Sequence, residues 1–305
     1  MQIVFGPILS RRFGVSLGVD LSPNTKQCNF DCVYCELQAK KPMDAQTHII
    51  PPQTILNSIK KALETHNDIQ VLTFTANGEP TLYPHLETLI VQTKDILRAY
   101  PNIKTLILSN GSLLYTQKEA LNHFDIVKFS FDSAINQKFK RVDKPSKTLD
   151  LEEIKQGIKS FAMQYHGELV AEVLIVDGIN DDIESNKNTA AFLREVNTKR
   201  IDLSTIDRPS SHRVYPVSNE KLYELSALYD NLNICVVVRK NCSINIAQQE
   251  LNNGEILELL KRRPLTHADC EILLTQASIK RLEYMCSIKQ IQIKNIAGVS
   301  FYCIN

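Results

Sequence analysis

The sequence contains no long apolar run and almost no net charge. Its longest candidate, residues 169–176, has only the length of a strand and contains Glu172, whereas a membrane-spanning helix needs about 20 apolar residues. The apolar stretch within the first 12 residues is too short for a signal peptide, and its arginines follow that stretch instead of preceding it. The formal net charge of +1 predicts no strong overall attraction to nucleic acid or to a membrane surface. These absences favour a cytoplasmic protein.

The eight cysteines form one tight group and no second one. Three of them lie within residues 28–35. In a reducing compartment a tight group of cysteines more often binds a metal or takes part in catalysis than forms disulfides. The other five are expected to be buried or idle thiols rather than an auxiliary metal site. They are Cys235, Cys242, Cys270, Cys286 and Cys303.

Strand and helix patterns alternate over most of the chain, whose length suits one α/β domain with a small appendage. Such alternation implies a parallel sheet with right-handed crossovers. The pattern changes after Asp207, so we predict a partial, TIM-like (β/α)6 barrel that is open on one side. The predicted strands are residues 16–21, 70–75, 104–109, 126–131, 169–176 and 201–206. The predicted helices are residues 53–66, 85–100, 119–124, 151–165 and 183–196.

The remainder of the chain has a different pattern. A helix over residues 220–229 and a strand over 233–238 are expected to complete the core, which we assign to residues 1–240. Residues 241–305 are predicted to form a winged helix-turn-helix-like domain, because three short helices are followed by two strands. A helical cap on the barrel is the alternative. The helices are expected at 256–260, 266–274 and 278–284, and the strands at 291–293 and 299–304.

The clustered cysteines have the spacing C-x3-C-x2-C, at Cys28, Cys32 and Cys35. Three thiolates in one short loop can each bind one iron of a 4Fe–4S cubane, which leaves the fourth iron without a protein ligand. Structural zinc is the alternative, but it requires four ligands, usually as two close pairs. The third cysteine has no such partner, and the nearest downstream histidine, His48, stands at no recognised spacing. The motif therefore predicts an iron–sulfur cluster with one open iron.

This motif, with Tyr34 directly before the third cysteine, resembles the signature of the radical S-adenosylmethionine (SAM) superfamily. The segments 10–14, 16–21 and 77–81, together with Arg208-Pro209, resemble the branch related to wyosine-type tRNA-guanosine synthetases. The resemblance implies that SAM chelates the open iron and is cleaved to methionine and a 5′-deoxyadenosyl radical. It also implies contact between Tyr34 and the cofactors, and an external electron donor of the flavodoxin or ferredoxin type.

A second motif, Asn77-Gly78-Glu79-Pro80, follows the second predicted strand. Gly78 permits a close approach of the backbone to a ligand, and Glu79 can accept hydrogen bonds from an ammonium group. The resemblance implies that Asn77, Gly78 and Glu79 hold the amino group of SAM. An Asn-Gly turn without a ligand is the alternative.

Small polar residues also end the next strands. Ser109 and Asn110 end the third strand, and Ser130 and Asp132 end the fourth. These side chains are expected to contact the ribose hydroxyls of SAM or the substrate, and the resemblance favours Ser130 and Asp132 for the ribose. Helix N-capping is the alternative. Gly178 follows the fifth strand, where the family packs the adenine, although it can also serve a turn.

Several cations flank the predicted barrel mouth. Arg12 lies near the first strand and Arg208 follows the sixth, so the two are expected to approach each other across the open side. A guanidinium suits a phosphate or carboxylate of the substrate, and a solvated surface position is the alternative for each. Arg11, His212 and Arg213 complete this predicted rim.

The substrate is less well specified than the cofactors. The wyosine enzymes carry a second cluster on additional N-terminal cysteines and a lysine that captures pyruvate. No cysteine precedes Cys28, and no lysine matches that role, so neither feature is expected. The winged-helix-like tail, with the basic segment 261–263, and the arginine rim favour a nucleoside in tRNA or another RNA. A protein or small metabolite is the alternative substrate, and an iron–sulfur regulator that binds DNA is the alternative to an enzyme.

Overall fold

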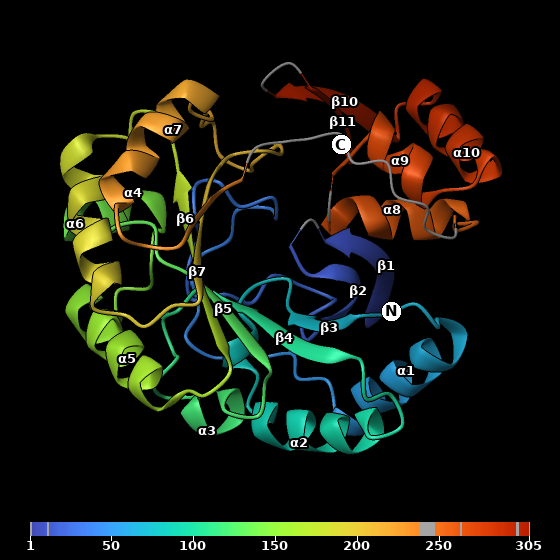
Figure 1. The fold of residues 1–305 in the computed structure, drawn as a ribbon. Helices are drawn as coiled ribbons and strands as arrows, with labels where there is room; N and C mark the ends of the chain where they lie inside the picture. Colours follow the sequence, from blue (N-terminus) through green and yellow to red (C-terminus); the bar gives the residue numbers. More distant parts are fainter. Residues whose placement is uncertain (1, 11, 238–247, 263, 297–298, 305) are drawn as a thin grey trace.

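The computed structural model describes residues 2–10, 12–237, 248–262, 264–296 and 299–304. Its core is a curved eight-stranded sheet whose strands are ordered as in the sequence, with β2 to β8 parallel and β1 antiparallel to β2 (Figure 1). The partial (β/α) barrel is therefore confirmed. The strands are β1 (Val4–Ser10), β2 (Gly14–Asp20), β3 (Val71–Thr75), β4 (Lys104–Ser109), β5 (Ile126–Ser130), β6 (Glu168–Ile175), β7 (Arg200–Thr205) and β8 (Ile234–Val236).

The six predicted barrel strands correspond to β2 through β7. Strand β8 extends the sheet at one edge, and β1, which the sequence pattern did not reveal, extends it at the other. Gly6 and Pro7 interrupt the strand pattern of β1, and the register of β1 against β2 shifts between Phe5 and Ile8. Proline is tolerated in a sheet on an edge strand or at a bulge, so the edge position explains why such a sequence is a strand.

Helices follow the strands and cover the outer face of the sheet (Figure 1). In α1 the residues Ile55, Leu56, Ile59 and Leu63 form the buried face, as their helical spacing predicts. The sequence pattern did not predict the short helix α4, because only Phe139 and Val142 of it are buried and they do not form a recognisable apolar face. The helices are α1 (Pro52–Thr65), α2 (Leu86–Leu97), α3 (Lys118–Leu121), α4 (Asn136–Val142), α5 (Leu151–Gln164), α6 (Ile183–Arg194) and α7 (Asn219–Ser226).

The two faces of the sheet differ in polarity. On β3, Leu72 and Phe74 belong to the hydrophobic core between the sheet and the helices, whereas Thr73 and Thr75 line a cavity on the inner face. This alternation is the two-residue period of a strand. The cavity side of β3 is consequently polar, while the main hydrophobic core lies between the sheet and the helices. A smaller apolar cluster, separate from that core, is formed by Val71, Leu106, Ile126 and Val170.

The C-terminal segment forms a small unit of helix, strand, helix, helix and hairpin, which is the winged-helix-like order that the sequence predicts. Strand β9 is only two residues long and pairs with β11, so no sequence period could reveal it. The boundary at residues 240 and 241 and Cys242 lie outside the described residues, and the division into domains stays a prediction. The elements are α8 (Asn253–Arg262), β9 (Leu265–Thr266), α9 (His267–Leu273), α10 (Gln276–Ser287), β10 (Ile291–Ile296) and β11 (Val299–Ile304).

Within the described part of the chain, no helix combines the length and the apolar character needed to cross a membrane.

Candidate active site

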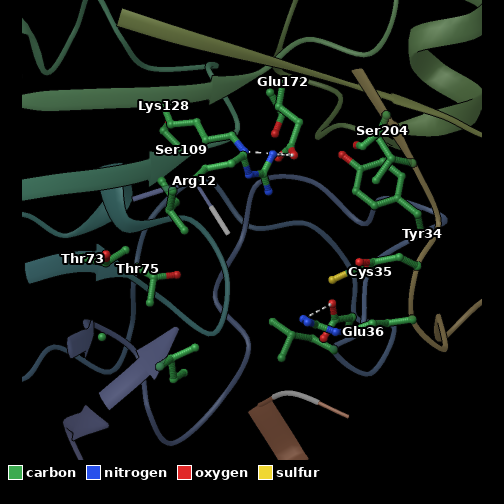
Figure 2. A pocket seen from close by; sticks show the side chains of 18 of the residues that line it. Arg12, Tyr34, Cys35, Glu36, Thr73, Thr75, Ser109, Lys128, Glu172 and Ser204 are labelled. Carbon is green, nitrogen blue, oxygen red and sulfur yellow. Dashed lines mark hydrogen bonds and ion pairs between the residues drawn. The ribbon is translucent and has the colours of Figure 1, made fainter. Parts of the chain in front are cut away.

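A cavity of about 560 Å³ opens inside the barrel (Figure 2). Its size lies within the roughly 300–1,000 Å³ of small-molecule and cofactor sites. The predicted site residues that line it are Arg12, Tyr34, Cys35, Asn77, Ser109, Ser130 and Arg208. Those that do not line it are Cys28, Cys32, Gly78, Glu79, Asn110, Asp132 and Gly178.

The cysteine loop, between β2 and α1, is held by backbone hydrogen bonds to distant segments. The amide of Gln27 donates to the carbonyl of Asn77 over 2.8 Å, and the amide of Glu79 returns a bond of 3.0 Å to the carbonyl of Gln27. The amide of Val33 donates to the carbonyl of Val142 over 2.8 Å. The loop is thus fixed both to the end of β3 and to the end of α4.

The three cysteine residues are partly exposed, but their thiol groups are largely buried. The Cys28 Sγ accepts from the amide of Phe30 over 3.4 Å, and the Cys32 Sγ donates to Asp143 Oδ1 over 3.4 Å. Burial raises the pKa of Cys28 to about 12 and also raises the pKa values of Cys32 and Cys35. Lys26 opposes this rise for Cys28 and Cys35, and cluster iron, when bound, would supply the further positive charge that favours thiolates.

These residues fit a 4Fe–4S cluster better than a single ion. Among the described residues, no three His, Cys, Asp or Glu side chains converge on a point that one metal ion could occupy. A cubane does not require such convergence, because each thiolate binds a different iron. The donor set is therefore three thiols from one loop, the set that the sequence motif predicts.

Gly78 follows β3 and pairs with Gln27 at the start of the cysteine loop. Its φ is +137°, and a Cβ built on it would lie 1.9 Å from the carbonyl oxygen of Gln27. The close approach predicted for this glycine is therefore seen, but its partner is the backbone of the cysteine loop. Gly78 lets the end of β3 and the cysteine loop pair directly.

The carboxylate of Glu79 joins the ends of β3 and β4. Its Oε1 accepts from the hydroxyl of Thr81 over 2.6 Å and from that of Ser109 over 2.8 Å, and its Oε2 accepts from the amide of Asn110 over 2.6 Å. Burial raises the pKa of Glu79, and these hydrogen bonds oppose that rise. The predicted contact of Glu79 with SAM stays a prediction, since the side chain is 1% exposed and already accepts these bonds.

Asp132 and Asp143 form a buried pair of carboxyl groups next to Cys32. The sequence did not predict that these two residues lie together. The hydroxyl of Tyr34 donates to Asp132 Oδ2 over 2.5 Å, and the amide of Leu174 donates to Asp132 Oδ1 over 2.8 Å. Burial raises the pKa of both carboxyls, and each lies within hydrogen-bonding reach of the other. Tyr34, Asp132, Asp143 and Cys32 thus form one continuous chain of contacts.

Gly178 lies in the turn that follows β6, outside the lining of the cavity. Its φ is +68°, and a Cβ added there would meet no atom within 4 Å. The neighbouring Asn180 fixes the turn by donating from Nδ2 to the carbonyls of Asp132 and Leu174, both over 2.9 Å. The structure therefore shows the turn, and the predicted contact with adenine stays a prediction.

A group of charged side chains lies on one side of the cavity (Figure 2). Arg12 contacts Glu172 at 2.9 Å and Asp202 at 2.8 Å, and Lys128 contacts the same two carboxylates at 2.9 and 3.2 Å. Burial alone would raise the pKa of Glu172, but Lys128 and Arg12 lower it to about 2. We call Arg12, Lys128, Glu172 and Asp202 the charged cluster.

Sequence reasoning found only Arg12 of this cluster. The available signal was a charged residue within an otherwise apolar run of a strand, as with Lys128 in β5 and Glu172 in β6. Burying such a charge costs free energy unless it is paired. The position alone therefore marks these residues as candidates, but only the fold shows that they meet.

The predicted rim is seen in part. Arg208 lines the cavity as Arg12 does, contacts Glu36 at 3.3 Å, and has a buried Nε without a hydrogen-bond partner among the described residues. His212 instead faces Asp31, and Arg213 is exposed beside Tyr215. Arg11 and Arg263 lie outside the described residues.

The family model of the Radical SAM superfamily matches residues 23–193, which include the cysteine loop and strands β3 to β6. The chain belongs to the radical SAM superfamily. Members use a 4Fe–4S cluster and SAM and require an external reductant. The three cysteines of this radical SAM protein are therefore its cluster-binding candidates.

The chain is also similar to a curated relative in sequence and to solved structures in fold. The chain is 48% identical over 306 residues to a UPF0026 protein of Helicobacter pylori, a match that covers 99% of this chain and 97% of the relative. Its fold is similar to that of TYW1 with a bound lysine–pyruvate adduct, at a TM-score of 0.50, 18% identity, and 71% and 74% coverage of the two chains. It is also similar to anSMEcpe with bound AdoMet, at a TM-score of 0.51, 16% identity, and 72% and 63% coverage.

Proposed function

We propose that this protein is an enzyme that reductively cleaves SAM and directs the resulting 5′-deoxyadenosyl radical to a nucleoside of tRNA or another RNA. The observation that carries the proposal is the position of Cys35 and Tyr34 in the lining of a ligand-sized cavity. The cluster, when bound, supplies the electron that breaks the carbon–sulfur bond of SAM. The protein supplies position and shields the radical from solvent.

The polar ends of the strands support the cofactor half of the proposal. Asn77, Ser109 and Ser130 line the same cavity as Cys35 and follow three adjacent strands. We propose that they contact SAM, while Gly78 and Glu79 keep the cysteine loop and the strand ends in register. Ligand sites of parallel sheets gather at the carboxyl ends of the strands, which is where these residues lie.

The charged cluster and Arg208 support the substrate half. Arg12 and Arg208 line one cavity with Lys128 and Glu172, so a polar substrate would meet both signs of charge there. TYW1 was solved with a lysine–pyruvate adduct, but Lys128 is held between Glu172 and Asp202 and would have to leave both to form one. We therefore propose that the reaction involves no pyruvate condensation. We propose that the target is a nucleoside and that the enzyme is cytoplasmic.

Anaerobic reconstitution followed by addition of dithionite and SAM tests the reaction. We expect 5′-deoxyadenosine from the native protein and none from the Cys32→Ala variant. Cys270→Ala is the matched control, because Cys270 is buried in the core of the C-terminal unit and does not line the cavity. Absence of 5′-deoxyadenosine from the iron-loaded native protein would refute the reaction.

The substrate needs a separate test. Nucleosides from RNA incubated with the active enzyme are analysed by mass spectrometry, and a new SAM-dependent nucleoside is expected. SAM cleavage without any altered nucleoside would refute the RNA target. Transfer of deuterium from a labelled peptide or metabolite pool into 5′-deoxyadenosine would then identify the other substrate class.

A further inference from the structure

A concentration of positive charge lies on the outer surface beside the cysteine loop. Five cations of this surface are exposed, and among the described residues none of them forms an ion pair with a carboxylate. The whole chain has a net charge of only +1, so this concentration is local. We call the five residues the basic face: Lys40, Lys41, Lys140, Arg141 and Lys147.

The segment that carries three of these cations contacts the loop between the cluster-binding cysteines. The amide of Asp31 donates to the carbonyl of Asp143 over 3.1 Å, and the amide of Ser146 donates to the carbonyl of Asn29 over 2.8 Å. The rings of Phe30 and Phe139 pack edge to face at 5.6 Å. The basic face is therefore built directly against residues that lie between Cys28 and Cys32.

Asp31 joins the two parts of the basic face. Its Oδ1 accepts from the backbone amide of Lys40 over 3.1 Å and from Lys26 Nζ over 2.8 Å. Its Oδ2 accepts from Lys144 Nζ over 3.4 Å. One buried carboxylate thus brings the segment around Lys40 next to the segment that follows α4.

We propose that the basic face docks an acidic one-electron carrier protein that reduces the cluster. This inference rests on the proposed function, because reductive cleavage of SAM consumes one electron from outside the protein. The carrier loses that electron and the cluster gains it, and no bond is made or broken in the transfer. A carrier needs only to approach the cysteine loop, whereas a substrate must enter the cavity.

The position of the basic face favours a carrier over RNA. None of its five residues lines the cavity, and α4 lies on the opposite side of the molecule from α8, α9 and α10 (Figure 1). Complexes between redox proteins are transient and bury a small contact area. Charge complementarity accelerates such encounters without a large apolar contact, and the basic face offers that kind of surface.

Stopped-flow reduction of the reconstituted protein tests the proposal. An acidic flavodoxin in its reduced form is mixed with the oxidised protein, and the decrease in visible cluster absorption is followed. We expect the Lys140→Glu/Arg141→Glu variant to be reduced at least tenfold more slowly at low ionic strength. The native rate should fall with added salt, because salt screens exposed charges.

The Lys60→Glu/Lys61→Glu variant is the matched control, since both lysines are exposed on α1, far from α4 (Figure 1). It should be reduced at the native rate, and dithionite should reduce all variants equally. If Lys140→Glu/Arg141→Glu lowers iron content, Lys41→Glu/Lys147→Glu replaces it, because those two side chains are exposed in loops.

An unchanged rate with flavodoxin in an iron-loaded variant would overturn the proposal. A loss of tRNA binding together with an unchanged reduction rate would assign the basic face to RNA instead. Because cluster reduction is read without SAM, a protein that accepts electrons from flavodoxin but forms no 5′-deoxyadenosine would refute the proposed reaction and leave the docking surface supported.

Discussion

Gly78 shows how one residue can determine whether the cysteine loop forms. Its positive φ and the carbonyl of Gln27, 1.9 Å from the position of a Cβ, exclude a side chain unless the backbone moves. We expect Gly78→Ala to lower the free energy of unfolding by about 2–4 kcal/mol. Iron incorporation should fall with it, because the loop would no longer pair with β3. Urea denaturation and iron analysis measure the two effects.

Gly178→Ala is the comparison for Gly78→Ala. It also has a positive φ, but an added Cβ would meet nothing within 4 Å. Its cost should therefore be only about 1 kcal/mol, from the backbone conformation alone. Equal losses of stability in the two variants would show that the positive φ, and not the close approach of the cysteine loop, causes the loss of stability in Gly78→Ala.

The ionisation of Glu172 makes the stabilisation by the charged cluster depend on pH. Its pKa is lowered to about 2 in the folded protein from a usual 4.5, because Lys128 and Arg12 outweigh the effect of burial. A lowered carboxyl pKa means that the stabilisation is present above pH 4.5 and is lost as the pH falls towards 2. We expect Glu172→Gln to cost about 3 kcal/mol at neutral pH. The difference from the native protein should shrink between pH 4.5 and 2.

Glu168→Gln on the same strand is the control for Glu172→Gln. Glu168 pairs with Lys104 at 2.8 Å, but both side chains are largely exposed. An exposed pair contributes only about 0–1 kcal/mol, so this variant should remain close to the native stability. A destabilisation by Glu168→Gln as large as that by Glu172→Gln would contradict the role of burial in the charged cluster.

Among single residues, the sequence could predict those with a local pattern. Cys28, Cys32 and Cys35 are defined by spacing over eight residues, so no fold was needed to find them. Lys128, Glu172 and Asp202 lie on three different strands, and Asp143 follows α4. Their contacts form only when the strands pair in register, so a single sequence cannot show which charges pair.

Among elements, the strands that are buried on both sides were predictable. Strands β2 to β7 are rich in apolar residues and lie between the barrel interior and the helices. Strand β1 contains Gly6 and Pro7, and α4 has only two buried residues, so each lacks the pattern that identifies a strand or a helix. The elements missed are thus those whose stability depends on their neighbours more than on their own sequence.

The N-terminus of helix α5 tests a prediction made from local sequence alone. The sequence offers Thr148 or Asp150 as its N-cap, and the structure shows Asp150 Oδ1 accepting from the amides of Glu152 and Glu153. We expect Asp150→Ala to lower the free energy of unfolding by about 1 kcal/mol. SAM cleavage should be unchanged, because Asp150 does not line the cavity. Thermal denaturation measures the stability.

Thr148→Ala provides the other half of the α5 test. The Thr148 hydroxyl donates to Asp44 at the surface and caps no helix amide. Its removal should change the stability by less than about 0.5 kcal/mol. A larger destabilisation by Thr148→Ala than by Asp150→Ala would show that the cap belongs to Thr148 instead.

At the scale of the whole molecule, charge is nearly balanced overall but unevenly distributed. The basic face lies beside the cysteine loop, and the charged cluster lies inside the barrel. The C-terminal unit carries cations and acids side by side, as in the pair of Lys261 and Glu258 at 2.6 Å. Any RNA binding through this unit would therefore depend on a few exposed cations and not on a broad basic surface.

Two such cations are Lys280 on α10, the last helix of the C-terminal unit, and Lys294 on β10. If the C-terminal unit holds RNA against the barrel, Lys280→Glu/Lys294→Glu should weaken tRNA binding while dithionite-driven SAM cleavage stays unchanged. The slope of log affinity against log salt concentration should fall by about 1 for each phosphate that the variant no longer neutralises. Lys60→Glu/Lys61→Glu changes the charge equally on α1 and should leave the slope unaltered. The same decrease in affinity in both variants would show that overall charge, and not the C-terminal unit, determines RNA binding.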